Sequence, residues 1–144
     1  MIERDYIMRM IAQLAAALSK IADLKKDKKY NEAQQIVQEA YGELFGFPTE
    51  MVQQMDAATL GFLLDDKEKI KALASLVHEE GEVLLLQGKL AECAACYQKA
   101  LDLYQQAWSR PALNRMNGKA EQGSDDAECL AAIRILQAKI ANHA

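Results

Sequence analysis

Apolar residues recur at steps of three and four along most of the chain, which is the spacing of one face of an α-helix. The segment 3–26 has a broad stripe of this kind, made of Ile7, Met10, Ile11, Leu14, Ala17, Leu18, Ile21 and Leu24. Similar stripes predict further helices over 30–45, 67–87, 90–108 and 125–142. No segment alternates at period two, so no strand is expected. The pattern therefore predicts an all-α fold.

Helix-ending signals divide this pattern into units. Gly46 and Pro48 close the second helix, and Gly88 marks the turn before 90–108. Thr49 and Asp56 are candidate N-caps of two short helices within 49–64, and Asp65 has capping-box spacing to Glu68. We expect hairpin-like units over 3–45 and 67–108, with the short helices 49–64 between them. A loop over 109–126 and a C-terminal helix over 125–142 complete one domain, 1–144.

The two hairpin-like units look like copies of each other. "KKYNEAQQIVQEAYGEL" begins at residue 28 and "GKLAECAACYQKALDLY" begins at residue 88. At an offset of sixty, the aligned pairs are Tyr30 with Leu90, Ala33 with Cys93, Val37 with Tyr97 and Ala40 with Ala100. Small residues seven apart lie on one helical face and let a neighbouring helix approach closely. The repeat therefore predicts tightly packed helix pairs.

Residues 74–105 resemble a tetratricopeptide repeat (TPR). The matching positions are Gly81, Gly88, Cys93, Tyr97 and Ala100-Leu101. Residues 14–45 resemble a degenerate copy, in which Ala33 and Ala40 match but Ile21 and Lys28 replace the two glycines. The offset of sixty differs from the 34-residue TPR period, so the resemblance implies TPR-like helical hairpins and not a regular solenoid. "MIERDYIMRMI" and "LVHEEGE" are also similar to an uncharacterised bacterial protein family, which implies no function.

The TPR resemblance implies where a partner binds, because the first helix of each hairpin lines the ligand groove of such domains. Carried over position by position, the candidate groove residues are Ser75, His78, Glu82, Leu85 and Leu86. A protein or peptide partner is therefore expected on this face. His78 would make binding sensitive to pH, since an unperturbed imidazole has a pKa near 6.5.

Composition narrows the class of partner. The net charge of −4 and the pI of about 5.2 lack the basic excess of a nucleic-acid binder, and "KKDKK" (25–29) is the one basic run. No stretch approaches 18 uncharged apolar residues, so no membrane span is expected. The N-terminal segment has acidic residues and a periodic pattern, which indicate a structural helix and not a secretion signal. We expect a cytoplasmic protein.

Three residue groups suggest chemistry, and each has a simpler structural explanation. Cys93 and Cys96 form a C-x-x-C, but the pair falls within a helix, where core packing is favoured over a redox role. Zinc binding would require Cys129 and a histidine to converge on the pair. "HEEGE" (78–82) fails as a metalloprotease motif because Glu82 stands where the second histidine belongs. The sequence thus predicts no catalytic residue, cofactor or bound metal.

Two functional hypotheses remain. The leading one is a protein–protein interaction module. The alternative is a small enzyme or a metal or redox sensor that uses His78 with nearby carboxylates, or Cys93 and Cys96. "EAYGELFGF" and "TLGFLL" place many apolar residues on short elements, and a leftover apolar surface would favour a homodimer.

Overall fold

The computed structural model describes residues 2–110, 112–114, 119–121 and 124–142. These residues form seven helices and two very short strands. The elements in chain order are α1 (Ile2–Lys26), α2 (Tyr30–Phe45), α3 (Thr49–Gln54), α4 (Ala57–Leu64), α5 (Lys67–Leu86), α6 (Leu90–Ser109), β1 (Ala112–Asn114), β2 (Lys119–Glu121) and α7 (Ser124–Asn142). The prediction of an all-α architecture is confirmed. None of the described helices combines the length and the apolar character needed to cross a bilayer.

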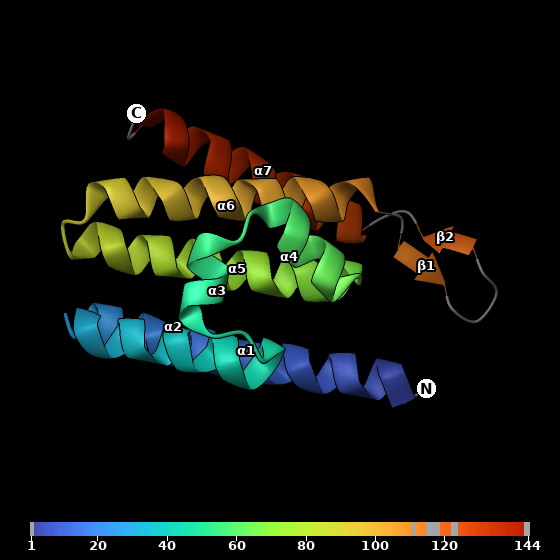
Figure 1. Ribbon diagram of the computed structural model, residues 1–144, viewed down its shortest axis with the longest axis horizontal. Helices are drawn as coiled ribbons and strands as arrows, with labels where there is room; N and C mark the ends of the chain where they lie inside the picture. Colours follow the sequence, from blue (N-terminus) through green and yellow to red (C-terminus); the bar gives the residue numbers. More distant parts are fainter. Residues whose placement is uncertain (1, 111, 115–118, 122–123, 143–144) are drawn as a thin grey trace.

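Helix α5 occupies the centre of the molecule. It packs most extensively on α6, and it also contacts α1, α2 and α4 (Figure 1). Helices α1, α5 and α7 run in one direction, while α2 and α6 run in the other. Helix α7 packs on α6, and the short helices α3 and α4 connect the α1–α2 pair to the α5–α6 pair.

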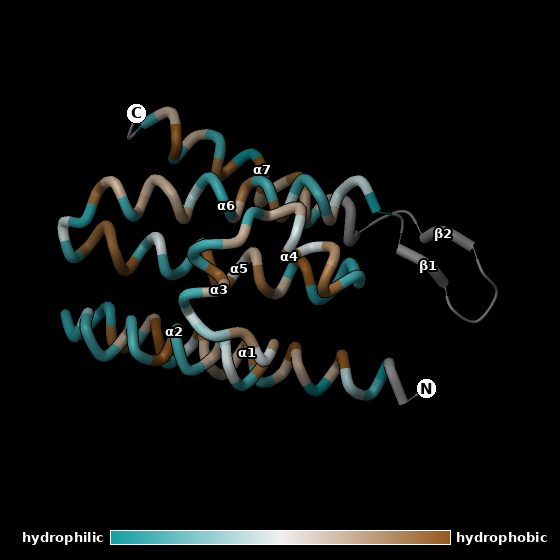
Figure 2. Tube along the Cα trace, viewed as in Figure 1, coloured by the Kyte–Doolittle hydropathy of each residue, from teal (hydrophilic) through white to brown (hydrophobic). Residues whose placement is uncertain are grey.

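The long helices other than α5 bury one face each, as their hydrophobic periodicity predicts, whereas α5 is buried over most of its circumference. Figure 2 shows hydrophobic and hydrophilic positions alternating along them. In α1 the fully buried residues are Met10, Leu14 and Ile21, which is a narrower stripe than the sequence suggests. Ile11 was expected in this stripe but is 40% exposed. It lies about 100° around the helix from Met10, beyond the reach of the neighbouring helices.

The short helix α4 also differs from the prediction, because one of its faces is exposed. Ala57, Leu60 and Gly61 are buried at helical spacing in α4, whereas Phe62 and Leu63 are exposed by 75% and 50%. The sequence suggests a helical corner packed under the longer helices and leaves open that some of its apolar surface stays uncovered. A helix of two turns can bury only one face, so Phe62 and Leu63 point away from the core.

Two predicted N-caps are wrong and one is right, while Gly46 is the left-handed C-cap of α2 as expected. Asp56 is the N-cap of α4, and its carboxylate accepts a hydrogen bond from the backbone N–H of Thr59 at 2.8 Å. Asp66, and not Asp65, caps α5 by accepting from the N–H of Lys69 at 3.1 Å. Asp65 instead adopts a left-handed conformation that ends α4. Helix α3 starts after Pro48, so Thr49 is its first residue and makes no cap.

The turn inside the α1–α2 pair and the turn inside the α5–α6 pair have the same conformation. Lys28 and Gly88 are both left-handed, with φ of 61° and 78°. The next residue in each turn donates its N–H to a carbonyl five residues earlier: Lys29 to Leu24 at 2.8 Å, and Lys89 to Leu84 at 2.9 Å. Lysine at position 28 thus performs the backbone function of glycine at position 88, at the steric cost of a left-handed non-glycine residue.

The aligned pairs of the internal repeat are buried with one exception. Ala33, Cys93, Val37, Tyr97, Ala40 and Ala100 are all at most 4% exposed. Leu90 was expected on the same apolar stripe but is 62% exposed, while its counterpart Tyr30 is partly buried. Leu90 is the first residue of α6 and lies beyond the reach of α5.

The segment expected to be only a loop contains the two strands. β1 and β2 pair antiparallel, with Ala112 opposite Glu121 and Asn114 opposite Lys119. Strands of three residues are too short to show a period-two pattern, which is why the sequence gives no sign of them. In α7, Cys129, Ile133 and Leu136 are buried at steps of four and three, as predicted.

Candidate functional site

The five candidate groove residues share the least buried side of α5. Ser75, His78, Glu82 and Leu85 are partly exposed, and Leu86 is 46% exposed. The other sides of this helix are buried against α1, α2, α4 and α6, because apolar residues cover most of its circumference. We call this side, defined by Ser75, His78, Glu82, Leu85 and Leu86, the α5 face.

Lys139 of α7 reaches across to the middle of the α5 face. Its Nζ lies 2.8 Å from Nε2 of His78 and 2.9 Å from Oε1 of Glu82. Since an ammonium only donates hydrogen bonds, Nε2 of His78 must accept, and the imidazole proton is on Nδ1. Tyr97 of α6 completes the cluster by donating its hydroxyl to Glu82. We call these four residues the Lys139 cluster.

The contacts around His78 hold its imidazole neutral. Its pKa is lowered, mainly because burial disfavours the charged ring and also because Lys139 is close by. The ring is also edge-on to Tyr97, with the centroids 5.7 Å apart. At neutral pH the cluster therefore contains one ammonium, one carboxylate and one neutral imidazole.

The carboxylate of Glu82 stays ionised in this setting. Burial alone would raise its pKa, but the hydrogen bonds from Tyr97 and Lys139 outweigh burial and lower it. Glu82 in turn helps to raise the pKa of the Tyr97 hydroxyl, together with the burial of that ring. Because Lys139 occupies Nε2 of His78 and one oxygen of Glu82, neither of these atoms is open to accept a proton from a substrate.

Helix α1 borders the α5 face on its other side. Lys25 forms a salt bridge with Glu79, and Nζ of Lys69 lies 5.1 Å from the ring centroid of Tyr6. The face is therefore a strip between α1 and α7, with charges of both signs on either side. The sequence places the five residues on one face but gives no sign that Lys139 covers its middle.

The cysteines have the environment of packed residues. Cys93 is 1% exposed, and burial raises its thiol pKa, which confirms the expected core position. Burial raises the pKa of Cys96 to about 12. A redox-active thiol needs the opposite shift, toward the thiolate at neutral pH.

The third cysteine is also a packed residue. Cys129 is buried in α7, where its thiol lies 3.6 Å from the backbone carbonyl of Tyr104. In the part of the chain that the structure describes, no three His, Cys, Asp or Glu side chains converge in a way that could hold a metal ion.

Sequence reasoning missed a buried polar pair on the opposite side of α5. Glu80 is 1% exposed and accepts a hydrogen bond of 2.6 Å from the hydroxyl of Tyr41. The signal was present, because Val77, Gly81 and Leu84 flank Glu80 at helical spacing. A glutamate within an apolar stripe is a buried carboxyl group that needs a partner.

The chain shows no significant similarity to any protein-family model, to curated proteins or to solved structures. Its function must therefore be argued from the arrangement of its own residues.

Proposed function

We propose that this chain is a protein-interaction module with TPR-like helical hairpins, and that its binding surface is the α5 face. The proposal depends on one observation: α1, α5 and α7 run in the same direction (Figure 1), and salt bridges from α1 and α7 to α5 border that face. In TPR-like hairpins the first helices line the ligand groove, and α1 and α5 are the first helices of the two pairs.

The surface suits an extended peptide. From Lys69, beside Tyr6, to Leu86 at the helix end, α5 rises about 26 Å at about 1.5 Å per residue. An extended segment of about eight residues covers that length. Tyr6 and Leu86 provide exposed apolar groups near the two ends, and the Lys139 cluster provides polar groups in the middle. The complementary partner has apolar residues on both sides of a polar centre.

Leu86→Arg tests the surface with little risk to the fold, because this side chain is already 46% exposed. The matched control is Met8→Arg, which replaces a 60% exposed apolar residue on the side of α1 opposite Tyr6. With tagged chains as bait in the native cell extract, we expect a protein that binds the wild type and the Met8 variant but is lost from the Leu86 variant. If every retained protein binds all three baits equally, the α5 face is not the binding surface.

A second copy of the chain is one partner that this experiment must consider. Phe62 and Leu63 on α4 form an exposed apolar pair away from the α5 face. We propose that any homodimer forms through this pair. Light scattering at rising concentration should then show a dimer that Phe62→Arg abolishes and Leu86→Arg preserves. A monomer at all concentrations would contradict the homodimer and leave the peptide-binding proposal unaffected.

A further inference from the structure

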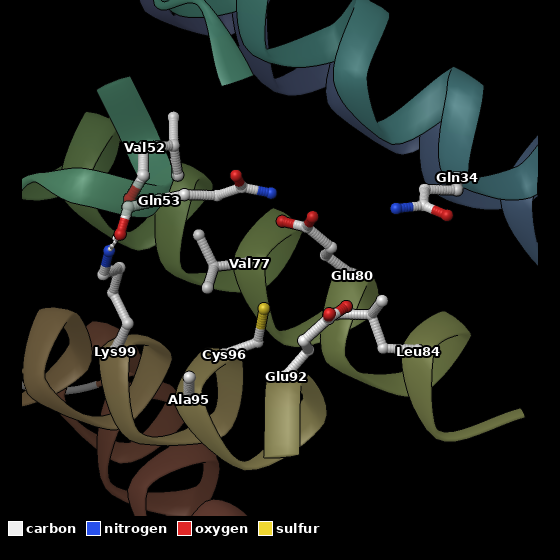
Figure 3. Close-up of a pocket in the computed structure, with 10 residues that line it drawn as sticks. All are labelled: Gln34, Val52, Gln53, Val77, Glu80, Leu84, Glu92, Ala95, Cys96 and Lys99. Atoms are coloured by element: carbon white, nitrogen blue, oxygen red, sulfur yellow. Dashed lines mark hydrogen bonds between the residues drawn. The ribbon is translucent and has the colours of Figure 1, made fainter. Parts of the chain in front are cut away.

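A cavity of about 340 Å³ lies between the two helix pairs (Figure 3). It is lined by residues of α2, α3, α5 and α6, and its α5 residues are Val77, Glu80 and Leu84. By helical spacing these three residues are on the side of α5 opposite His78 and Glu82. The volume is at the small end of the range for ligand pockets. The cavity is therefore separate from the α5 face and sized for a small group.

Glu80 is the buried polar residue of this cavity. Its side chain is 1% exposed, and Oε1 accepts the hydrogen bond from Tyr41. Oε2 is also buried but has no hydrogen-bond partner among the described residues. Burial raises the pKa of Glu80, while the hydroxyl of Tyr41 and the nearby amide of Gln53 act in the opposite direction. A buried carboxylate oxygen without a partner is an incomplete site, because its desolvation is not compensated.

The only lysine among the lining residues does not complete it. Lys99 donates hydrogen bonds to the backbone carbonyls of Val52 and Gln53, the second at 2.8 Å, at the end of α3 (Figure 3). Its ammonium is thus held on the α3 side of the cavity. The other polar lining groups are the carboxylate of Glu92 and the side-chain amides of Gln34 and Gln53. The two amides can donate or accept hydrogen bonds, so they do not select the charge of a ligand. The two carboxylates outnumber the single ammonium of Lys99, and this favours a ligand that donates hydrogen bonds and carries positive charge.

The rest of the wall is apolar. Val52, Val77, Leu84 and Ala95 contribute aliphatic side chains to it. A ligand with a charged head and a short hydrocarbon chain would satisfy both kinds of surface. An anion would face Glu80 and Glu92, and a neutral alcohol would leave the charge of Glu80 uncompensated.

We propose that this cavity binds the ammonium group of a short aliphatic amine, with Glu80 as its buried counter-ion and the aliphatic wall around its methylene chain. The ammonium donates one hydrogen bond to Oε2 of Glu80, while Tyr41 retains Oε1. The amine is either a free small molecule or the side chain of a lysine in a partner. The site is independent of the α5 face.

NMR titration of the wild-type chain with pentylamine tests the proposal at pH 7.5. We expect saturable shifts of backbone amides in α5 and α6 around the cavity. Pentanol and pentanoate have the same chain with a neutral or anionic head, and they should cause no saturable shifts there. Equal effects of pentanol and pentylamine would overturn the proposal. Nα-acetyl-lysine methylamide distinguishes the two sources, because it binds only if the cavity admits a lysine side chain in a peptide.

Glu80→Gln keeps the size of the side chain and the acceptor for Tyr41 but removes the charge. We expect it to weaken pentylamine binding about ten- to a hundredfold, the loss of one charge-assisted hydrogen bond. The matched control is Glu39→Gln, the same change at an exposed position of α2 that does not line the cavity. Unchanged affinity of the Glu80 variant would refute the proposal.

A second variant decides the question if Glu80→Gln does not fold. Ala95 is exposed at the cavity wall, so Ala95→Leu should fold normally while its side chain fills part of the cavity. It leaves Glu80 unchanged and should abolish the saturable shifts. Pentylamine binding to this variant with wild-type affinity would place the amine elsewhere.

Discussion

Gly81 of α5 packs tightly against side chains of α6, and we expect Gly81→Ala to destabilise the fold. A Cβ at this position would lie 2.8 Å from Cδ1 and Cε1 of Tyr97 and 3.2 Å from Cβ of Cys96. The Tyr97 ring cannot move aside easily. It is 1% exposed, its hydroxyl is bonded to Glu82, and it is packed perpendicular to the ring of His78.

Two opposing contributions, helix propensity and overpacking, set the change in the free energy of unfolding. Alanine is favoured over glycine in a helix interior by about 1 kcal/mol. Overpacking a filled core costs about 1–3 kcal/mol, and the fixed ring of Tyr97 places this case in the upper half of that range. The free energy of unfolding should therefore fall by about 1–2 kcal/mol.

Gly42→Ala is the matched control. Gly42 is exposed in α2, and a Cβ there would meet no atom within 4 Å. Only the helix-propensity term remains, so this variant should gain about 0.5–1 kcal/mol. Urea unfolding followed by circular dichroism measures both variants.

A second background separates the steric term from other causes. In a Tyr97→Leu chain the ring is absent, so Gly81→Ala should become neutral or stabilising relative to that chain. The reasoning is refuted if Gly81→Ala stabilises the wild-type chain as much as Gly42→Ala does.

Four further predictions concern titratable groups of the core and of the Lys139 cluster. Tyr41→Phe removes the hydroxyl that donates to Glu80, and we expect urea unfolding to show that the free energy of unfolding falls by about 1–3 kcal/mol; an unchanged midpoint would contradict the importance of this bond. Because burial raises the pKa of Glu80, its contribution to stability is fully present below the unfolded pKa and is lost as pH rises through the folded pKa. The stability of Glu80→Gln relative to wild type should therefore increase with pH over that interval, as thermal melts at a series of pH values would show, and a constant difference would refute it. The thiol of Cys96, with a pKa of about 12, should react slowly with a disulfide reagent at pH 8 until urea unfolds the chain; a rapid reaction of this thiol in the native state would refute its burial. The imidazole of His78 should titrate below 6.5 by NMR, and Lys139→Met should raise its midpoint by removing a neighbouring positive charge; a midpoint above 6.5 in the wild type would contradict the lysine contact.

The helices and most of their buried faces could be predicted because periodicity and end signals are local. The predicted helix 30–45 has the same bounds as α2, and Asp56 caps α4 as expected. Local signals are ambiguous where two neighbouring residues could both form the same helix cap. Asp65 and Asp66 are adjacent and both can cap, and only the left-handed ending of α4 leaves that role to Asp66.

The candidate site could be predicted only in part, because its chemistry depends on distant residues. The sequence placed His78 and Glu82 on one face, but their partner Lys139 is some sixty positions away on another helix. No spacing rule relates such positions. The pairing of Tyr41 with Glu80 was missed for the same reason, although the apolar neighbours of Glu80 indicate that it is buried.

The matching turns at Lys28 and Gly88 differ in what holds their shape. Each has a left-handed residue followed by a backbone hydrogen bond to a carbonyl five residues earlier. Glycine adopts this conformation without strain and lysine does not. The turn at Gly88 therefore keeps its geometry by itself, whereas the turn at Lys28 relies on the packing of α1 against α2.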